Sequence, residues 1–245
     1  MNSEQEMKRR TRRDFLVLGA GAATAIGGWE WLMHSPEQDG IPGPLRHVLG
    51  LDRRVTRGLL FSDGHLAPEF PRDRVEPIIV NGDYGLDDEL DLAEWKLQVT
   101  PYGAARNPVS LNMDDIRRLP KVEHTFEFKC IEGWSKVVNW AGARLSDFTA
   151  RHAAGSEKAR FVGLETPDKE YFVGVDMASA LHPQTLLCYE MNGKPLEAGH
   201  GAPLRLIIPV KYGIKNLKRI GQIVYQDTPP RDYWAQEGYD YYAGL

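Results

Sequence analysis

Hydrophobic and polar residues alternate in several short segments of the chain. Residues 95–99 and 122–130 follow the two-residue period of a half-buried strand. In the longer segment, the face that carries Phe126 and Phe128 also carries Cys130. The pattern therefore places Cys130 at the end of a strand, on the side of the core residues.

Further short strands and helices are predicted on both sides of this segment. Asn112 is expected to cap a short helix whose first turn is acidic, and Pro120 follows the end of that helix. The order of short elements lacks the regular spacing of βαβ units and therefore predicts an α+β fold. The other expected helices cover residues 145–152 and 177–181, and the other expected strands cover residues 160–165, 171–175, 186–191, 204–209 and 220–226.

The N-terminal residues follow a different pattern, in which a basic run leads into an apolar stretch. Lysines and arginines crowd positions 8–13, and residues 15–32 are apolar or small apart from Glu30. This is the architecture of an export signal. Residues 11–16, Thr-Arg-Arg-Asp-Phe-Leu, resemble the twin-arginine motif, which directs folded proteins across the membrane. We therefore expect a periplasmic protein whose signal is either cleaved or kept as a membrane anchor.

The same patterns divide the chain into three segments. Residues 1–33 form the export signal or anchor. Residues 34–77 are rich in Pro, Gly, Arg and Asp and are predicted to be a linker and wrapping segment, with an amphipathic helix at residues 45–60. Residues 78–245 contain no internal repeat and are expected to form one globular domain.

Composition narrows the classes of function. The chain of 245 residues is 42% hydrophobic, which is enough for a substantial core. Its formal net charge of −4 provides no global positive field, so we expect no nucleic-acid partner. The two cysteines, Cys130 and Cys188, exclude a disulfide framework and weigh against a zinc site built from thiolates. One disulfide between them stays open, although Cys188 lies in an apolar run typical of core residues.

Cys130 is the first candidate for chemistry. A lone cysteine at a strand end is commonly a buried, inert thiol. It is also the soft ligand that high-valent molybdenum or a comparable metal accepts from a protein, and the metal would keep it deprotonated. The same thiol could instead be a nucleophile with His200 as its base and no metal. The residues alone leave these interpretations open.

A basic segment supplies a candidate anion site. Residues 198–226 contain several lysines and arginines but no acidic residue. Gly199 and Gly201 allow backbone amides to approach a ligand, while Arg205 and Lys218 can form charge-assisted bonds with a phosphate. A solvated basic loop would have the same composition, so the segment alone does not identify a ligand.

Several short motifs follow one another in a fixed order along residues 80–234. They are Cys-x-x-x-Trp-Ser from residue 130, Leu-His-Pro from residue 181, Asn-Gly-Lys-Pro-Leu from residue 192, Gly-Ala-Pro-x-Arg-Leu-Ile from residue 201 and Lys-Tyr-Gly-x-Lys from residue 211. In order and spacing they resemble the sulfite oxidase superfamily, and within it the catalytic subunits of periplasmic protein-methionine-sulfoxide reductases. The resemblance implies a sulfite oxidase-type molybdopterin-binding domain that performs two-electron oxo transfer and reduces an S-oxide or N-oxide.

The resemblance also implies roles for individual residues. Cys130 would be the catalytic residue that ligates molybdenum. His200 would hydrogen-bond the pterin, although the methionine-sulfoxide reductases have Asn at its position. The other residues expected to bind Mo-molybdopterin are Asn81, Tyr84, Gly85, Thr166, Arg205, Asn216, Leu217 and Lys218.

Substrate and partners follow less directly. Ile131 and Glu132 succeed Cys130 where sulfite oxidases have a run with arginines, so oxidation of sulfite is the less favoured alternative. The expected substrate is a small-molecule or protein-bound oxide. The sequence has no cysteine pattern for haem attachment or an iron–sulfur cluster, so electrons are expected from a separate partner such as a membrane haem protein. A cofactor-binding module without turnover is a further alternative.

Overall fold

The segments of alternating polarity form two five-stranded sheets. The computed structural model of the protein describes residues 3–38, 41–60, 65–86, 90–103 and 107–244. Both sheets belong to the compact unit Ser62–Leu245, and the residues before it, Met1–Phe61, form a second unit. The first sheet has the order β10-β9-β6-β5, with β11 also paired to β9, and the second has the order β4-β3-β12-β7-β8.

The strands are short and almost all antiparallel. Only β12 and β3 run parallel among the described pairs. The mixed sheets, joined by brief helices, confirm the predicted α+β fold. The strand bounds are β3 (Leu97–Thr100), β4 (Val109–Leu111), β5 (Lys121–Lys129), β6 (Ser135–Arg144), β7 (Phe161–Glu165), β8 (Phe172–Asp176), β9 (Leu186–Met191), β10 (Lys194–Pro195), β11 (Arg205–Ile207) and β12 (Gln222–Gln226).

The helices between the strands start at the residues that the sequence indicates. The side chain of Asn112 accepts a hydrogen bond from the backbone of Asp115 at 3.1 Å, and the carboxylate of Asp115 accepts from the backbone of Asn112 at 3.0 Å. This reciprocal cap begins α3 as predicted. The bounds are α3 (Met113–Arg117), α4 (Leu145–His152), α5 (Met177–Ala180) and α6 (Tyr233–Gln236), with 3-10 turns η1 (Arg72–Arg74), η2 (Ser156–Lys158), η3 (Ala198–His200) and η4 (Gly213–Lys215).

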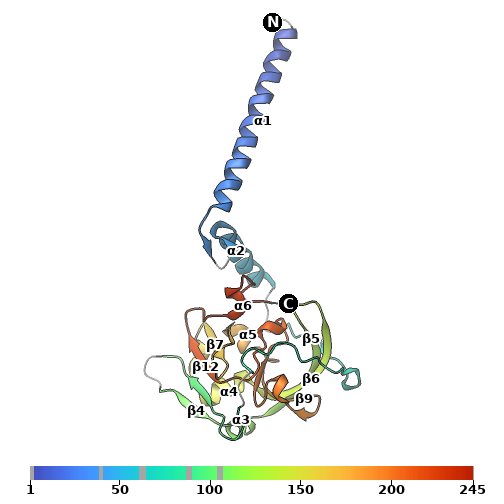
Figure 1. The fold of residues 1–245 in the computed structure, drawn as a ribbon, viewed down its shortest axis with the longest axis vertical. Helices are drawn as coiled ribbons and strands as arrows, with labels where there is room; N and C mark the ends of the chain where they lie inside the picture. The colour runs from blue at the N-terminus through green and yellow to red at the C-terminus, as the bar shows by residue number, and fades with distance from the viewer. Residues whose placement is uncertain (1–2, 39–40, 61–64, 87–89, 104–106, 245) are drawn as a thin grey trace. The chain divides into compact units, whose positions relative to one another are not determined.

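Strands β5 and β6 form a long hairpin that carries one part of the core. In Figure 1 this hairpin lies on one side of the unit, while β12 and β7 lie on the other. Phe126 and Phe128 of β5 are buried with Trp140 of β6 and Cys188 of β9 in one hydrophobic cluster. The face predicted for β5 is therefore confirmed. A second cluster packs β3, β7, β8 and β12 against α3 and α4.

Cys188 fills the core. Its thiol donates to the carbonyl of Glu190 at 3.1 Å, and burial raises the pKa of this thiol to about 12. Both cysteines are free, so the disulfide that the sequence left open does not form. A thiol held protonated and wholly buried has no access to substrate or metal.

Gly142 marks the closest backbone contact between β6 and β9. A Cβ on Gly142 would lie 2.7 Å from the Cα of Cys188, next to the carbonyl of Leu187. Because backbone cannot yield as the tip of a side chain can, Gly142→Ala should lower the free energy of unfolding by about 1–3 kcal/mol. Chemical denaturation would measure this, with Gly244→Ala as the control, since a Cβ there meets no atom within 4 Å. Equal stability of the two variants would contradict the close contact.

Residues 65–77, which belong to the predicted linker and wrapping segment, run along the first sheet. The backbone of Phe70 donates to Thr125 at 2.8 Å, and the backbone of Glu76 donates to Val137 at 2.9 Å. These bonds add the segment to β5 and β6 through main-chain contacts. They also fix where the chain continues toward the cavity described below.

The aromatic C-terminal segment covers this unit. The hydroxyl of Tyr241 donates to the carbonyl of Pro230 at 3.1 Å. The ammonium of Lys215 lies 4.6 Å from the centre of the Tyr241 ring and forms a buried ion pair with Asp232. The tail is thus joined to η4 by charge as well as by packing.

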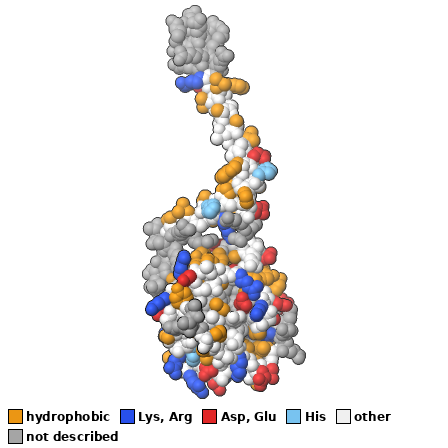
Figure 2. All heavy atoms as spheres, turned by 90° about the vertical axis from the view of Figure 1, so that its left-hand side faces the viewer, with side chains coloured by type: hydrophobic (Ala, Val, Ile, Leu, Met, Phe, Trp, Pro, Cys, Tyr) orange, Lys and Arg blue, Asp and Glu red, His pale blue; other side chains and the backbone are white. Residues whose placement is uncertain are grey.

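The unit before residue 62 contains two helices, α1 (Ser3–Met33) and α2 (Gly43–Leu60), and a short hairpin of β1 (Glu37–Gln38) and β2 (Ile41–Pro42). Helix α2 confirms the helix predicted there. Within α1, the segment Arg13–Met33 is long and apolar enough to cross a membrane, by length and composition alone. A signal sequence meets the same criterion. Hydrophobic side chains, orange in Figure 2, line α1 and are exposed.

Candidate functional site

A cavity of about 270 Å³ opens beside the end of the β5–β6 hairpin. Its walls come from the segment before β3, the loop after β5, the region of η3 and β11, and the residues around η4. The fold therefore gathers chain positions that lie more than a hundred residues apart. Seven of the predicted site residues line this cavity: Asn81, Tyr84, Cys130, His200, Arg205, Asn216 and Lys218.

Cys130 directly follows β5 and begins the loop that returns to β6. Its backbone N–H donates to Trp134 at 2.9 Å, and the backbone of Gly133 donates to Cys130 at 3.1 Å. Gly133 has a φ of 89°, a left-handed conformation that favours glycine and closes the turn. Cys130 is only 9% exposed yet lines the cavity. The thiol is thus held by a tight hairpin turn and is reachable only from the cavity side.

Asn81 joins the thiol to a carboxylate. Its Nδ2 lies 3.7 Å from Sγ of Cys130 and donates to Oε2 of Glu132 at 3.0 Å. The indole Nε1 of Trp134 donates to the same oxygen at 3.2 Å. Two neutral donors hold this carboxylate beside the thiol. Glu132 is the only acidic residue among the described residues that line the cavity.

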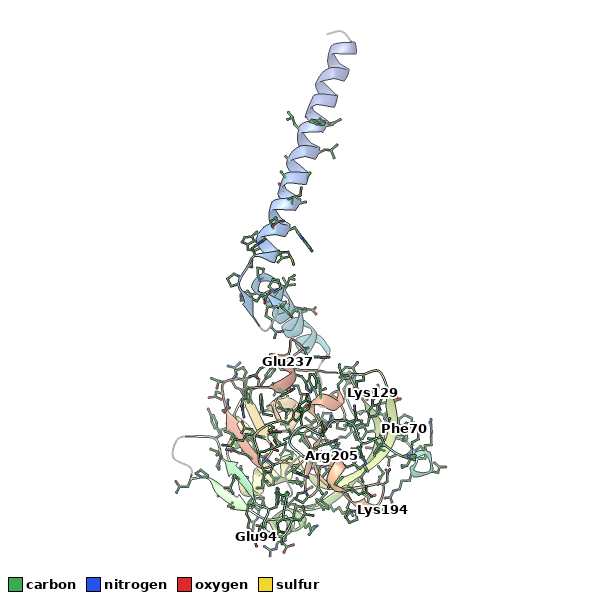
Figure 3. The ribbon with its side chains drawn as sticks, viewed as in Figure 1. Phe70, Glu94, Lys129, Lys194, Arg205 and Glu237 are labelled. Carbon is green, nitrogen blue, oxygen red and sulfur yellow. The ribbon has the colours of Figure 1, made fainter. Side chains whose placement is uncertain are left out.

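Arg205 is a cation in the interior of the fold, as Figure 3 shows. Its guanidinium donates to the carbonyls of His200 at 3.0 Å and Asn216 at 3.4 Å, and it lies 4.8 Å from the ring centre of Trp140. Its Nε has no hydrogen-bond partner, and no described acidic residue pairs with it. Burial lowers the pKa of Arg205 to about 10, while Cys188 acts in the opposite direction. Arg205 is therefore a largely uncompensated positive charge at a cavity wall.

Lys218 supplies the second cation. Its ammonium donates to the carbonyls of Asn81 at 2.9 Å, Gly82 at 2.8 Å and Gly199 at 2.8 Å. Burial and then Arg205 lower the pKa of Lys218 to about 8, while Asp83 raises it. Lys218 thus ties the segment before β3 to η3 and adds positive charge to the same wall as Arg205.

His200 and Asn216 flank Arg205. Burial, followed by the charges of Arg205 and Lys218, lowers the pKa of His200, so its imidazole is neutral at neutral pH. The side chain of Asn216 accepts from the backbone of Ile208 at 2.6 Å and donates to a backbone carbonyl at 3.0 Å. Asn216 therefore shapes the wall, whereas His200 retains a neutral ring that can donate and accept.

Three predicted binding residues lie behind the cavity surface. Gly85 has a φ of 75° and packs directly on the side chain of Thr166. The hydroxyl of Thr166 accepts from the backbone of Tyr171 at 3.1 Å. Leu217 is wholly buried. In this structure these residues support the wall, and their contact with a cofactor stays a prediction.

The basic segment supplies fewer cations to the cavity than its composition suggests. Lys211 pairs with Asp176 at 3.4 Å, and Lys215 pairs with Asp232. Both acidic partners lie outside residues 198–226, so the sequence window alone could not reveal this neutralisation. Arg205 is the cation of this segment that both lines the cavity and has a buried, unused Nε donor.

Aromatic and aliphatic residues that the sequence analysis did not assign to the site form the rest of the lining. Tyr171 donates its hydroxyl to the carbonyl of Ile214 at 2.6 Å, and burial raises its pKa. Part of the aromatic C-terminal segment, Trp234 and Tyr239, forms a wall of the cavity. The unforeseen lining residues include Ile78, Ile79, Phe128, Ile131, Trp134, Tyr171, Trp234 and Tyr239.

Comparison with known proteins gives one matching family and several relatives. The family model described as oxidoreductase molybdopterin binding domain matches residues 84–234. A protein of Azospira oryzae, assigned by inference as the protein-methionine-sulfoxide reductase subunit YedZ1, is 34% identical over 77% of this chain and 71% of its own length. The protein-methionine-sulfoxide reductase catalytic subunit MsrP of Campylobacter jejuni is 29% identical over 96% of this chain and 81% of its own length.

A solved structure is also similar. The crystal structure of the sulfane dehydrogenase SoxCD from Paracoccus pantotrophus superposes with a TM-score of 0.52 at 19% identity. The similarity covers 58% of this chain and 40% of that one. At this level of identity it shows the fold alone.

Proposed function

The chain belongs to the oxidoreductase molybdopterin-binding domain family, and on that premise we propose that it reduces methionine sulfoxide or a related S-oxide. Membership makes the protein an oxidoreductase that binds a molybdopterin cofactor. It does not favour a metal-free cysteine nucleophile or a module without turnover. The balanced reaction takes an S-oxide, two electrons and two protons to the thioether and water.

The cavity contains the donors that this cofactor needs. A molybdopterin carries a phosphate, and Arg205 offers a buried positive charge with an unused Nε donor. A metal on that cofactor needs a soft ligand, and Cys130 lines the same cavity. Without an anion, the buried guanidinium would be only a cost to the fold. The residues present therefore fit the cofactor.

Each chain residue would then have a distinct task. When bound, the cofactor supplies a molybdenum centre that exchanges two electrons and an oxygen atom. Cys130 would ligate the metal, and Arg205 with Lys218 would neutralise the phosphate. Asn81 and the neutral His200 would hydrogen-bond the pterin. Gly85, Thr166 and Leu217 would support this arrangement from behind.

The lining also bears on the substrate. Apolar side chains, among them Ile79, Ile131 and Trp234, surround the polar groups of the cavity. Such a rim suits the apolar chain beside a sulfoxide group, because that chain leaves water on binding. The names of the relatives point to methionine sulfoxide.

A single observation carries the proposal: the Cys130 thiol and the buried, unpaired donor of Arg205 share one cavity. The test is an assay of purified, molybdenum-loaded protein with methionine sulfoxide, dimethyl sulfoxide, trimethylamine N-oxide and sulfite. An artificial dye would donate or accept the electrons. We expect turnover with the sulfoxides and little with sulfite. Turnover with sulfite alone would overturn the proposed direction and substrate.

Glu132 should exclude anions from the cavity. Its carboxylate lies beside Cys130, where sulfite oxidases have arginines, so Glu132→Gln should strengthen inhibition by sulfite or sulfate roughly fivefold through lost repulsion. Because methionine sulfoxide carries no net charge on its sulfoxide, its KM should change by less than about twofold. Steady-state inhibition kinetics would measure both quantities.

Glu127→Gln is the matched control for this prediction. Glu127 is a carboxylate of β5 that accepts from Ser135 at 2.6 Å and does not line the cavity. The Glu127→Gln variant should have the same inhibition constants for sulfite and sulfate as the parent. Unaltered anion inhibition in Glu132→Gln would show that Glu132 does not set the charge preference.

Export and electron supply complete the proposal. The twin-arginine motif and the apolar segment Arg13–Met33 support export to the periplasm, with α1 retained as an anchor. The sequence has no motif for haem attachment or an iron–sulfur cluster, so electrons would come from a separate membrane haem protein. Fractionation of cells that express the full chain would test the anchor, since a cleaved signal would leave the protein in the soluble periplasmic fraction.

A further inference from the structure

Helix α2 carries an exposed apolar stripe that the proposed chemistry does not use. The stripe consists of Leu45, Val48, Leu49 and Val55. These residues are spaced three, four or seven residues apart, and in a helix such spacings place side chains on one face. These residues are between 41% and 62% exposed. A stripe of this length on a water-soluble linker would favour aggregation unless something covers it.

The charge of α2 indicates what covers it. The helix contains four arginines and one aspartate, a formal charge of 4 − 1 = +3 with histidine neutral, in a chain whose net charge is −4. Gly50 follows Val48 by two residues and therefore lies about 200° around the helix. Arg46 precedes Val48 by two residues and lies at about the same angle from it. A basic amphipathic helix of this kind matches the interface of an anionic bilayer, where phosphates meet acyl chains.

The position of α2 in the chain points to the same surface. Nine residues, 34–42, separate the end of α1 from the start of α2. Trp29 and Trp31, near the end of α1, are 62% and 64% exposed, and tryptophan favours the level of the lipid headgroups. The backbone of Gly43 donates to Pro36 at 3.0 Å, which joins the first residue of α2 to the residues that follow α1. If α1 spans the membrane, α2 begins at the membrane surface.

We propose that α2 lies in the interface of an anionic lipid bilayer, with its apolar stripe toward the acyl chains and its net positive charge favouring the lipid phosphates. The proposal rests on the anchor assigned to α1 under the proposed function, and not on the redox chemistry. Helix α2 would hold the start of the linker at the membrane, where a membrane electron donor is found.

Spin labels on the full chain can test this surface. Both native cysteines are buried, so an introduced surface cysteine should react first, and the unsubstituted chain gives the background from Cys130 in the cavity. Val48→Cys reports the apolar stripe, Gly50→Cys the opposite face, and Ala23→Cys the middle of α1. Each variant would be placed in bilayers of phosphatidylcholine with or without phosphatidylglycerol, and its label would be probed with oxygen and with a water-soluble nickel complex.

We expect the label at Val48 to be exposed to oxygen and shielded from nickel in the anionic bilayer, and the label at Gly50 to show the reverse. Removal of phosphatidylglycerol should shift Val48 toward water. The proposal would be overturned if the label at Val48 were accessible to nickel. It would also be overturned if contact with protein immobilised that label and the bilayer did not increase its accessibility to oxygen. A water-exposed label at Ala23 would instead refute the anchor, which separates the two failures.

Discussion

Cys130→Ser should yield a folded protein that binds molybdenum more weakly and retains less than about one hundredth of the sulfoxide reductase activity. Loss of groups that merely orient metal ligands already lowers affinity 10- to 100-fold, so loss of the soft ligand itself should exceed that range. The serine hydroxyl has nearly the same size but stays protonated at neutral pH, and the turn closed by Gly133 does not depend on the sulfur. Elemental analysis and dye-linked turnover would measure both losses.

Cys188→Ala is the matched control, because it removes the other thiol of the chain. Cys188 is wholly buried among apolar residues and should contribute only to stability. The variant should keep its molybdenum and its turnover while losing about 1 kcal/mol of unfolding free energy. X-ray absorption should show one more sulfur ligand on the molybdenum of the active parent protein than on the molybdenum that remains in Cys130→Ser. Full loading of that variant with unchanged sulfur coordination would refute the assignment of Cys130.

Arg205→Met should release the cofactor without unfolding the domain. Arg205 is 3% exposed, and its guanidinium lacks a paired acid among the described residues and has an unused Nε donor, so its charge costs free energy unless an anion is bound. Methionine fills similar space beside Trp140 and removes that cost. Loss of a charge-assisted phosphate contact should lower cofactor occupancy at least tenfold. Pterin fluorescence after release and denaturation would measure occupancy.

Thermal unfolding distinguishes binding from folding in this experiment. The parent should melt at a higher temperature with cofactor than without, because a ligand that binds only the native state stabilises it. In Arg205→Met that difference should vanish, while the cofactor-free midpoint stays within a few degrees of the parent. Lys129→Met, which removes a half-buried cation of β5 outside the cavity, should preserve the difference. A retained difference in Arg205→Met would contradict its role at the phosphate.

The elements of the fold followed from local patterns. The alternation of β5, the cap at Asn112 and the helix at residues 145–152 were all readable, since each depends on neighbours within a few residues. The order of the strands in the sheets could not be predicted from such local patterns. The parallel pairing of β12 with β3 joins segments more than a hundred residues apart, and periodicity contains no information about such partners.

The candidate site divides in the same way. Cys130 and the cations of residues 198–226 stood out by residue type and spacing. The sequence did not indicate that Tyr171, Trp234 and Tyr239 line the cavity, because tertiary packing brings these residues there. Lys215 shows the limit most clearly, since it belongs to the basic segment but is neutralised by Asp232 of the C-terminal segment.

The sequence by itself determined the fold class, the strand-end cysteine and the family motifs, because each is written in residues close together along the chain. Only the tertiary structure decided which charges meet in the cavity. It joined Asn81 to Glu132 beside Cys130, directed Lys215 and Lys211 to acids elsewhere, and left Arg205 buried without a paired acid among the described residues. Electrostatic free energy depends on distance and burial, and these exist only once distant segments have packed together.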